Sequence, residues 1–397
     1  MNKNLLPLVF SIAFIAGSQL TNSLLGPALP VMAEFYAVAE HQVQQLVVNF
    51  MLGLGFSQLI YGPLADAYGR RRAFWLGQSI FLLGNLIGLL GIGSLQLLSL
   101  GVFVQGLGAG SNQILARCLL SDSYRGSRLS NSFALLGMAA SVVPVIAPLA
   151  GGFITAHFGW QALFAVVGLS CFSLLVVAGL WLPETHSTAD GQLKLRPVLV
   201  QYQKLLSEAP FIRYSSFAWI SSVGLMYMIT SVPFVLQHDF GLGVELSGAL
   251  MMIPAVGLAL GGAANRRLLG PLGELKTLLL AASVPVSAAL ILLFAGDLLA
   301  WVLIAMIAIS LSVGMIYPIS QTGLFSHYHR QAGTASALMG CLQMSITASV
   351  IGGVHRMIEP SVHGMTLVFG LMGLAVFAVI SMAAKLQAGP VLSGGTD

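Results

Sequence analysis

The densest cluster of small and charged residues in the sequence lies at positions 62–72. It reads Gly-Pro-Leu-Ala-Asp-Ala-Tyr-Gly-Arg-Arg-Arg, which places one carboxylate, Asp66, just ahead of three consecutive arginines. Glycine permits tight turns and close helix approach, and a carboxylate pairs readily with guanidinium groups. The spacing favours a specific charged turn between two helices, and an ordinary solvated loop is the alternative. The residues of interest are Gly62, Asp66, Gly69, Arg70 and Arg71.

A second motif, Ala-Pro-Leu-Ala-Gly-Gly at positions 147–152, carries no charge. Small residues let two membrane helices approach closely, and a proline bends a helix. We therefore predict that Pro148, Gly151 and Gly152 shape a close helix–helix contact. Ordinary packing of small residues is the alternative.

The sequence offers little support for enzymatic chemistry. It holds no HExxH motif, no GxSxG motif and no acidic pair within an apolar segment, so an intramembrane enzyme is a remote alternative. No metal site, disulfide or cofactor is predicted, because the three cysteines are odd in number and form no CxxC pair. They are Cys118, Cys171 and Cys341.

The elements that position these motifs follow from composition. Only 8% of the 397 residues are charged and 57% are hydrophobic, whereas a soluble protein carries roughly 25% charged residues. The net charge of +4 rests on so few charges that it does not indicate nucleic-acid binding. The composition predicts an all-α integral membrane protein. The continuously apolar segments exclude a β-barrel, whose strands alternate.

The lengths of the segments without charged residues predict twelve transmembrane helices, since one crossing needs about 20 apolar residues. Two gaps, 73–116 and 129–183, are long enough for two helices each. The others hold one each and span residues 4–33, 42–65, 214–237, 246–265, 277–296, 298–326, 331–354 and 360–384.

The basic residues predict the orientation of these helices. With the N-terminus in the cytoplasm, all 17 lysines and arginines except Arg356 fall on the cytoplasmic side, as the positive-inside rule requires. Both termini are then cytoplasmic. The longest polar stretch, 183–213, is predicted to be a cytoplasmic linker between two six-helix bundles, residues 1–182 and 214–397. A fainter copy of the first motif, with Asn265 in place of Asp66, supports such a repeat.

The motif at 62–72 resembles the signature loop of the major facilitator superfamily, and the motif at 147–152 resembles its antiporter motif. The resemblance covers nearly the whole chain and is strongest to the twelve-helix drug:proton antiporter branch, the Bcr/CflA group, and its EmrD-like members. In that family the loop is a cytoplasmic latch. The resemblance implies that Arg117 and Glu184 join Asp66 and Arg70 in this latch. The matching segments are Gly26–Pro30, Ser57–Pro63, Gln105–Gly106, Pro183–Thr185, Gly314–Pro318 and Gly333–Ala335.

The resemblance also implies a function. We expect a secondary active transporter that exports amphipathic or lipophilic toxic compounds by alternating access and proton antiport. The alternatives are an exporter of one metabolite, such as a siderophore or amino acid, and a facilitator without a buried proton site. The expected setting is the bacterial cytoplasmic (inner) membrane, as a multi-pass monomer in the lipid bilayer that binds small substrates and protons.

Neutral polar, aromatic and thioether side chains are the candidates for lining a central substrate cavity. Methionine and aromatic residues adapt to several ligands, although each is more often a core or lipid-facing residue. Buried amides form interhelical hydrogen bonds as often as they line cavities. The candidates are Gln19, Asn22, Ser23, Asn49, Phe50, Asn112, Tyr227, Met315, Gln343 and Met344.

Proton coupling has no evident carrier in the middle of the membrane. No Asp, Glu, Lys or Arg falls in the centre of a predicted helix, although intramembrane ionisable groups usually mark ion coupling. Two residues associated with coupling in the family are also replaced, because Thr21–Leu24 lacks an Asp and Val102 stands where many relatives have Arg. The remaining candidates are Glu34, Asp66 and Asp239, at the rims. Histidines at helix ends, including His238 and His355, are expected to be solvated.

Overall fold

The computed structural model describes residues 5–182, 184–185, 195–296, 298–328 and 331–387, and every regular element in these ranges is a helix. The first group, which we call the N-terminal group, comprises α1 (Leu6–Leu25), η1 (Gly26–Ala28), α2 (Leu29–Tyr36), α3 (Glu40–Tyr68), α4 (Arg70–Leu90), α5 (Leu95–Ser123), α6 (Gly126–Phe158) and α7 (Gln161–Trp181). After α8 (Leu195–Ser207), the C-terminal group comprises α9 (Ala209–Phe234), η2 (Val235–Asp239), α10 (Val244–Leu250), α11 (Ile253–Ala295), α12 (Leu299–His327), α13 (Ala332–Met357) and α14 (Val362–Gln387).

Ten of the described helical segments are long and apolar enough to cross a membrane. The sequence-based count of twelve differs from these ten in two places. The 29-residue helix α5, which carries several glycines and polar residues, is not among the ten. One 52-residue segment, Val244–Ala295, covers two predicted crossings, and its helix α11 is broken at Gly273. The all-helical membrane fold is thus confirmed, while the number of crossings stays a prediction.

Two of the glycines with positive φ mark corresponding turns in the two groups of helices. Gly69 has φ 94° between α3 and α4, and Gly273 has φ 75° at the break in α11. L-residues rarely adopt this backbone region, which explains why glycine stands at both turns. Asp66 lies one helical turn before Gly69, whereas Asn265 lies two turns before Gly273. The expected equivalence of Asn265 and Asp66 was therefore wrong in register.

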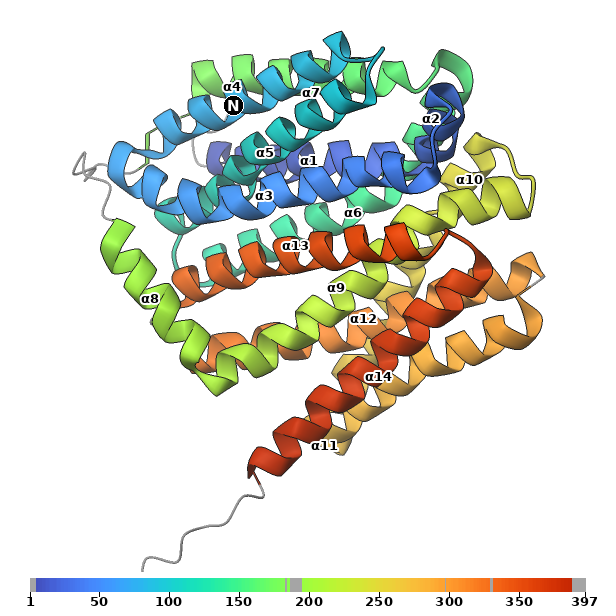
Figure 1. Ribbon diagram of the computed structural model, residues 1–397. Helices are drawn as coiled ribbons and strands as arrows, with labels where there is room; N and C mark the ends of the chain where they lie inside the picture. The colour runs from blue at the N-terminus through green and yellow to red at the C-terminus, as the bar shows by residue number, and fades with distance from the viewer. Residues whose placement is uncertain (1–4, 183, 186–194, 297, 329–330, 388–397) are drawn as a thin grey trace, which may run out of the picture.

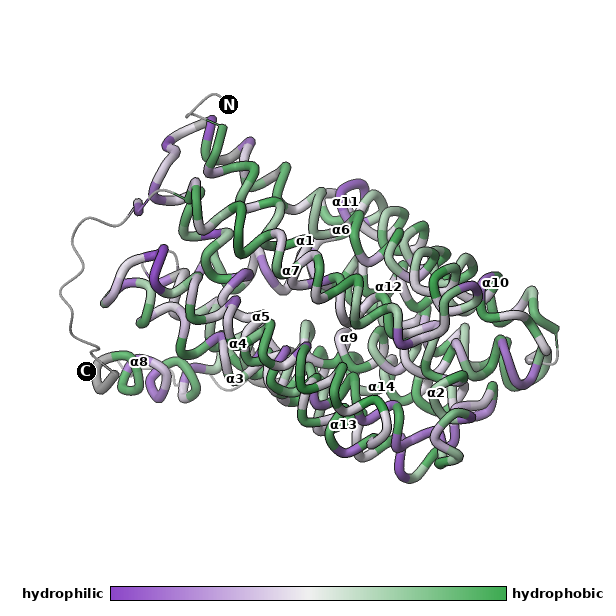
Figure 2. The backbone as a smooth tube through the Cα atoms, turned by 90° about the horizontal axis from the view of Figure 1, so that it is seen from above, coloured by the Kyte–Doolittle hydropathy of each residue, from purple (hydrophilic) through white to green (hydrophobic). Residues whose placement is uncertain are grey.

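The two groups of helices occupy separate parts of the molecule (Figure 1). One apolar core joins residues from Phe10 to Leu182, and another joins buried residues from Tyr202 to Ile380. A further core connects the groups, because Phe234, Ala348 and Ile351 pack with residues of the N-terminal group. Hydrophobic residues run along most of the helices, and hydrophilic ones gather mainly towards their ends (Figure 2). This pattern is the one that a lipid environment requires of a helical protein.

The same close contact recurs in both groups. Gly106 of α5 lies against the backbone carbonyl of Phe50 in α3, and Gly314 of α12 lies against the backbone of Leu258 in α11, too close for a side chain at either glycine. Small residues let membrane helices pack by direct backbone contact. The repeated contact agrees with a chain built from two related halves.

Candidate functional site

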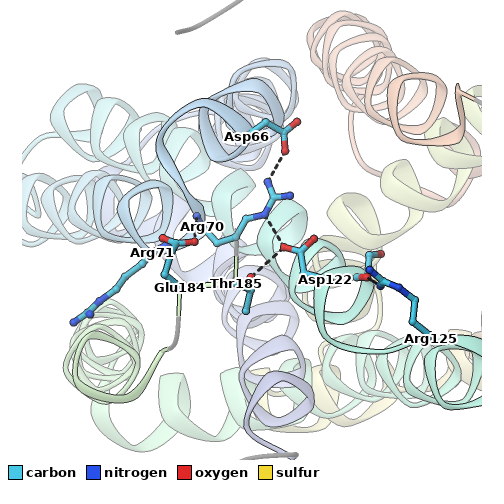
Figure 3. A network of polar contacts seen from close by, with 8 residues as sticks. Asp66, Arg70, Arg71, Asp122, Arg125, Glu184 and Thr185 are labelled. Carbon is cyan, nitrogen blue, oxygen red and sulfur yellow. Dashed lines mark hydrogen bonds and ion pairs between the residues drawn. The ribbon is translucent and has the colours of Figure 1, made fainter. Parts of the chain in front are cut away.

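The charged turn predicted at positions 62–72 forms a connected network, shown in Figure 3. We call it the basic-end network, and the end of the molecule that holds it the basic end. At its centre, Arg70 is buried to 7% side-chain exposure. Its Nη1 lies 2.6 Å from Asp66 Oδ1, and its Nε lies 2.9 Å from Asp122 Oδ2. A guanidinium needs this double pairing, because an unpaired buried charge is costly.

Glu184 joins the network through the backbone of α4. Its two carboxylate oxygens accept hydrogen bonds from the backbone N–H groups of Arg70 (2.9 Å) and Arg71 (3.1 Å). These are the first residues of α4, where unpaired N–H groups and the helix dipole favour an anion. Arg71 in turn donates to the carbonyl of Gly179 in α7 at 2.7 Å.

Gly69 is required here for a second reason besides its positive φ. A Cβ atom on Gly69 would lie 2.6 Å from Glu184 Oε2, which is closer than real Cβ contacts allow. The glycine therefore makes room for the carboxylate that caps α4.

The structure changes the predicted membership of the network in two respects. Asp122, near the end of α5, pairs with Arg70 and also accepts a hydrogen bond from Thr185 Oγ1 at 3.0 Å, although it was not among the predicted members. One feature of the sequence could have identified Asp122: it is an acidic residue near the end of a predicted helix that carries few charges. Arg117 is exposed and makes no ion pair within the described part of the chain, so its assignment to the network was wrong.

The small-residue motif of α6 lies at the opposite end, which we call the far end, and contacts the C-terminal group. Gly152 would place a Cβ 2.7 Å from the carbonyl of Val244 and 3.1 Å from Gly248 Cα, both in α10. Gly248 faces the carbonyl of Pro148 in return. Gly151 lies against Leu24 of α1 within its own group. The motif thus provides a backbone-to-backbone contact between α6 and α10.

Polar contacts also join the two groups at the far end, and we call them the far-end latch. His238 of η2 lies 2.8 Å from Glu40 and 3.8 Å from Glu34, through its two ring nitrogens. The side-chain amide of Gln237 donates to the carbonyl of Pro27 at 2.9 Å, and that of Gln44 donates to the carbonyl of Thr230 at 3.0 Å. Of the three predicted coupling candidates, Glu34 lies in this latch, Asp66 in the basic-end network, and Asp239 beside His238 on the surface.

His355 is not solvated, contrary to expectation. Its side chain is 4% exposed, and its Nε2 lies 3.1 Å from the hydroxyl oxygen of Thr230. The single hydroxyl hydrogen of Thr230 points to the backbone carbonyls of Met226 (2.9 Å) and Tyr227 (3.2 Å). The hydroxyl therefore accepts from Nε2–H, which leaves Nδ1 of His355 as a buried acceptor with no partner among the described residues.

The predicted cavity residues fall into several settings. Three are core residues in this conformation, namely Phe50, Tyr227 and Met315. Asn49 donates to Ser99 at 2.5 Å. Asn112 accepts from Gln78 and lines a cavity of about 470 Å³ among α1, α4, α5, α6 and α7. The side chain of Asn22 lies outside the described part. Four more are half-buried: Gln19, Ser23, Gln343 and Met344.

Within the described residues, no three His, Cys, Asp or Glu side chains are grouped so as to hold a metal ion. The three cysteines are free thiols.

The sequence is similar to two bacterial resistance proteins. Multidrug resistance protein D of Escherichia coli is 27% identical over 384 residues, which cover 94% of each chain. The bicyclomycin resistance protein homolog of Haemophilus influenzae is 26% identical over 328 residues, covering 81% of this chain and 82% of that relative.

Solved structures agree on the fold. The D-xylose–proton symporter superposes with a TM-score of 0.73 at 13% identity and covers 96% of each chain. The human organic anion transporter TETRAN superposes with a TM-score of 0.69 at 16% identity, covering 94% of this chain and 98% of that one. The sequence profile of the Major Facilitator Superfamily matches residues 9–352, which is most of the chain. The protein therefore belongs to the Major Facilitator Superfamily.

Proposed function

We propose that this chain is a secondary active efflux transporter that exports amphipathic or lipophilic toxic compounds by alternating access. The names of its relatives, which are multidrug and bicyclomycin resistance proteins, support export of small toxic molecules. The observation that carries the mechanism is the far-end latch, which bonds the two groups of helices together at one end through side chains such as Gln44 and His238. A transporter closed at one end exposes its substrate site to the other.

The proposal includes an orientation. The basic end faces the cytoplasm and the far end faces the periplasm of a bacterial inner membrane, as the distribution of basic residues favours. The two bundles, 1–182 and 214–397, move as bodies joined by the linker 183–213. With the far end latched, the described conformation is inward-facing. The chain works as a monomer.

The basic-end network supports the gating step. Asp66, Arg70, Asp122 and Glu184 tie the ends of α3, α4, α5 and α7 together within the N-terminal group. This pairing fixes the direction of α4 after the turn at Gly69. It therefore holds the helix ends at the cytoplasmic side of the N-terminal group in one conformation. A change in these contacts biases the balance between outward- and inward-facing states by a few kcal/mol.

Substrates are proposed to bind between the groups, near half-buried polar and thioether side chains. The absence of an acidic residue from the centre of the spans suits lipophilic or amphipathic compounds better than strongly cationic ones. Protons are proposed to act at the rims, where Glu34, Asp66 and Asp239 lie. The side chains proposed to contact substrate are Gln19, Asn22, Ser23, Gln343 and Met344.

Everted membrane vesicles test this proposal. A lipophilic fluorescent dye is added, a pH gradient is imposed, and accumulation is followed with and without an uncoupler. We expect uptake that collapses when the gradient is dissipated, and that falls strongly in Asp66→Asn vesicles with an equal amount of inserted protein. Dye movement equal to that of vesicles without the protein would refute efflux. Uptake insensitive to the uncoupler would refute proton coupling alone.

A further inference from the structure

A cavity of about 420 Å³ opens at the far end between the two groups of helices. Residues at the starts of α3 and α5 form one side, and the end of α13 forms the other. Its polar lining consists of His41, Gln42, Gln45, Gln96, Ser99 and Arg356. The volume is in the range of small-molecule sites.

The one permanently charged side chain that lines this cavity is basic. Arg356, the one basic residue that the sequence places on this side of the membrane, lines it together with His41, and no lining residue is acidic. Glu40 precedes His41 but bonds to His238 in the far-end latch. Glu359 lies beyond Arg356 and is exposed outside the lining. An anion is therefore the ligand that this cavity favours.

A chain of hydrogen bonds holds two of the lining side chains, Gln45 and Ser99, in position. The Gln45 side-chain amide donates to Asn49 Oδ1 at 3.1 Å, and Asn49 Nδ2 donates to Ser99 Oγ at 2.5 Å. Because Ser99 Oγ accepts here, its own hydroxyl hydrogen remains available to a ligand. The arrangement assigns a role to Asn49, which holds two lining side chains in place.

The lining also has apolar walls, formed by Val38 and Leu95. Amide, hydroxyl and guanidinium donors suit a carboxylate, to which Arg356 can donate two parallel hydrogen bonds. The apolar walls suit a hydrocarbon skeleton. We propose that this cavity binds a small organic anion carrying a carboxylate.

Such a ligand joins the two groups of helices, because Arg356 belongs to α13 and the remaining donors belong to α3 and α5. It therefore stabilises the conformation that is closed at the far end. The binding site is separate from the proposed substrate path and does not depend on the direction of transport.

The test is isothermal titration of the purified full chain in lipid nanodiscs, with benzoate as the probe and benzamide as its neutral counterpart. We expect benzoate to bind at least about tenfold more tightly than benzamide, a difference of about 1.4 kcal/mol. Arg356→Gln should weaken benzoate at least about tenfold, and Ser99→Ala should weaken it by a smaller factor. Glu359→Gln is the matched control and should keep the wild-type affinity.

Three results would overturn the proposal. They are wild-type protein that shows no benzoate binding, benzamide that binds as tightly as benzoate, and a folded Arg356→Gln variant that keeps the wild-type affinity. The comparison of benzoate with benzamide uses wild-type protein alone, so it tests the proposed carboxylate binding even if a variant fails to fold. Loss of dye efflux in vesicles would not affect these outcomes, so the two proposals fail separately.

Discussion

At the scale of single residues, the basic-end network depends on charges placed where each has a partner. Arg70 is buried, yet both ends of its guanidinium meet carboxylates. The spacing of Asp66 and Arg70, four residues apart, made their pairing predictable from sequence. The pairing of Arg70 with Asp122 was not predictable, because these residues are 52 positions apart and meet only when α4 packs on α5.

Asp122→Asn tests how much the pairing of Asp122 with Arg70 contributes to stability and to transport. The change removes a carboxylate from a buried guanidinium, and we expect the folded state to lose about 1–3 kcal/mol together with most of the dye efflux. Thermal unfolding of the purified protein and vesicle uptake measure the two effects. Arg117→Gln is the control, since Arg117 is exposed and lacks an ion pair in the described residues. Equal behaviour of the two variants would contradict the role of Asp122.

Gly69→Ala tests the turn. Its backbone conformation, with φ 94°, is nearly restricted to glycine, and an added Cβ would strike Glu184. We expect a loss of about 1–3 kcal/mol from backbone strain and displacement of the carboxylate. Gly62→Ala is the matched control from the same motif, because a Cβ there meets nothing within 4 Å. A Gly69→Ala melting temperature equal to that of Gly62→Ala would show that the turn tolerates a side chain.

At the scale of elements, the far end closes through contacts between α2, α3 and α6 on one side and η2, α9 and α10 on the other. The sequence indicated the close-packing motif of α6, but its partner in α10 follows only from the packed structure. Likewise, the position of His355 near a helix end suggested solvation, whereas the packing of α13 against α9 buries it. Periodicity and charge locate helices, but they do not tell which helix will cover a given end.

The far-end latch depends on His238. Its ring lies 2.8 Å from Glu40 and 3.8 Å from Glu34, so one side chain of η2 meets two side chains of the N-terminal group. Removing the ring should lower the population of the closed far end by up to about fivefold, the upper value for one exposed ion pair.

Spin labels across the far end measure this shift. His238→Ala removes the ring and should increase the population with a longer far-end distance. His363→Ala, at an exposed histidine on the same end, should leave the distances unchanged. Equal distance distributions in His238→Ala and in the unchanged protein would contradict the role of His238 in the latch.

At the scale of the whole molecule, the scarcity of charge predicted the membrane fold, and the motifs predicted the family. The number of crossings does not follow from helix length and hydropathy alone, because α5 is less apolar than its neighbours and α11 runs through the turn at Gly273. The conformation was beyond prediction from sequence. It depends on which end is closed, and the same apolar pattern suits the inward- and outward-facing states equally.

The central claim is that the two groups of helices alternate between closure at the far end and closure at the basic end. The direct measurement is double electron–electron resonance on protein in nanodiscs, in which the three native cysteines are replaced. One label pair is placed at exposed far-end positions, Phe35 and Leu246, and the other at exposed basic-end positions, Tyr68 and Leu272. Distances are compared with and without a lipophilic substrate, at two pH values. We predict reciprocal changes, so that the far-end distance grows in the conditions in which the basic-end distance shrinks. Distances that stay fixed in all conditions, or that grow and shrink together, would contradict alternating access.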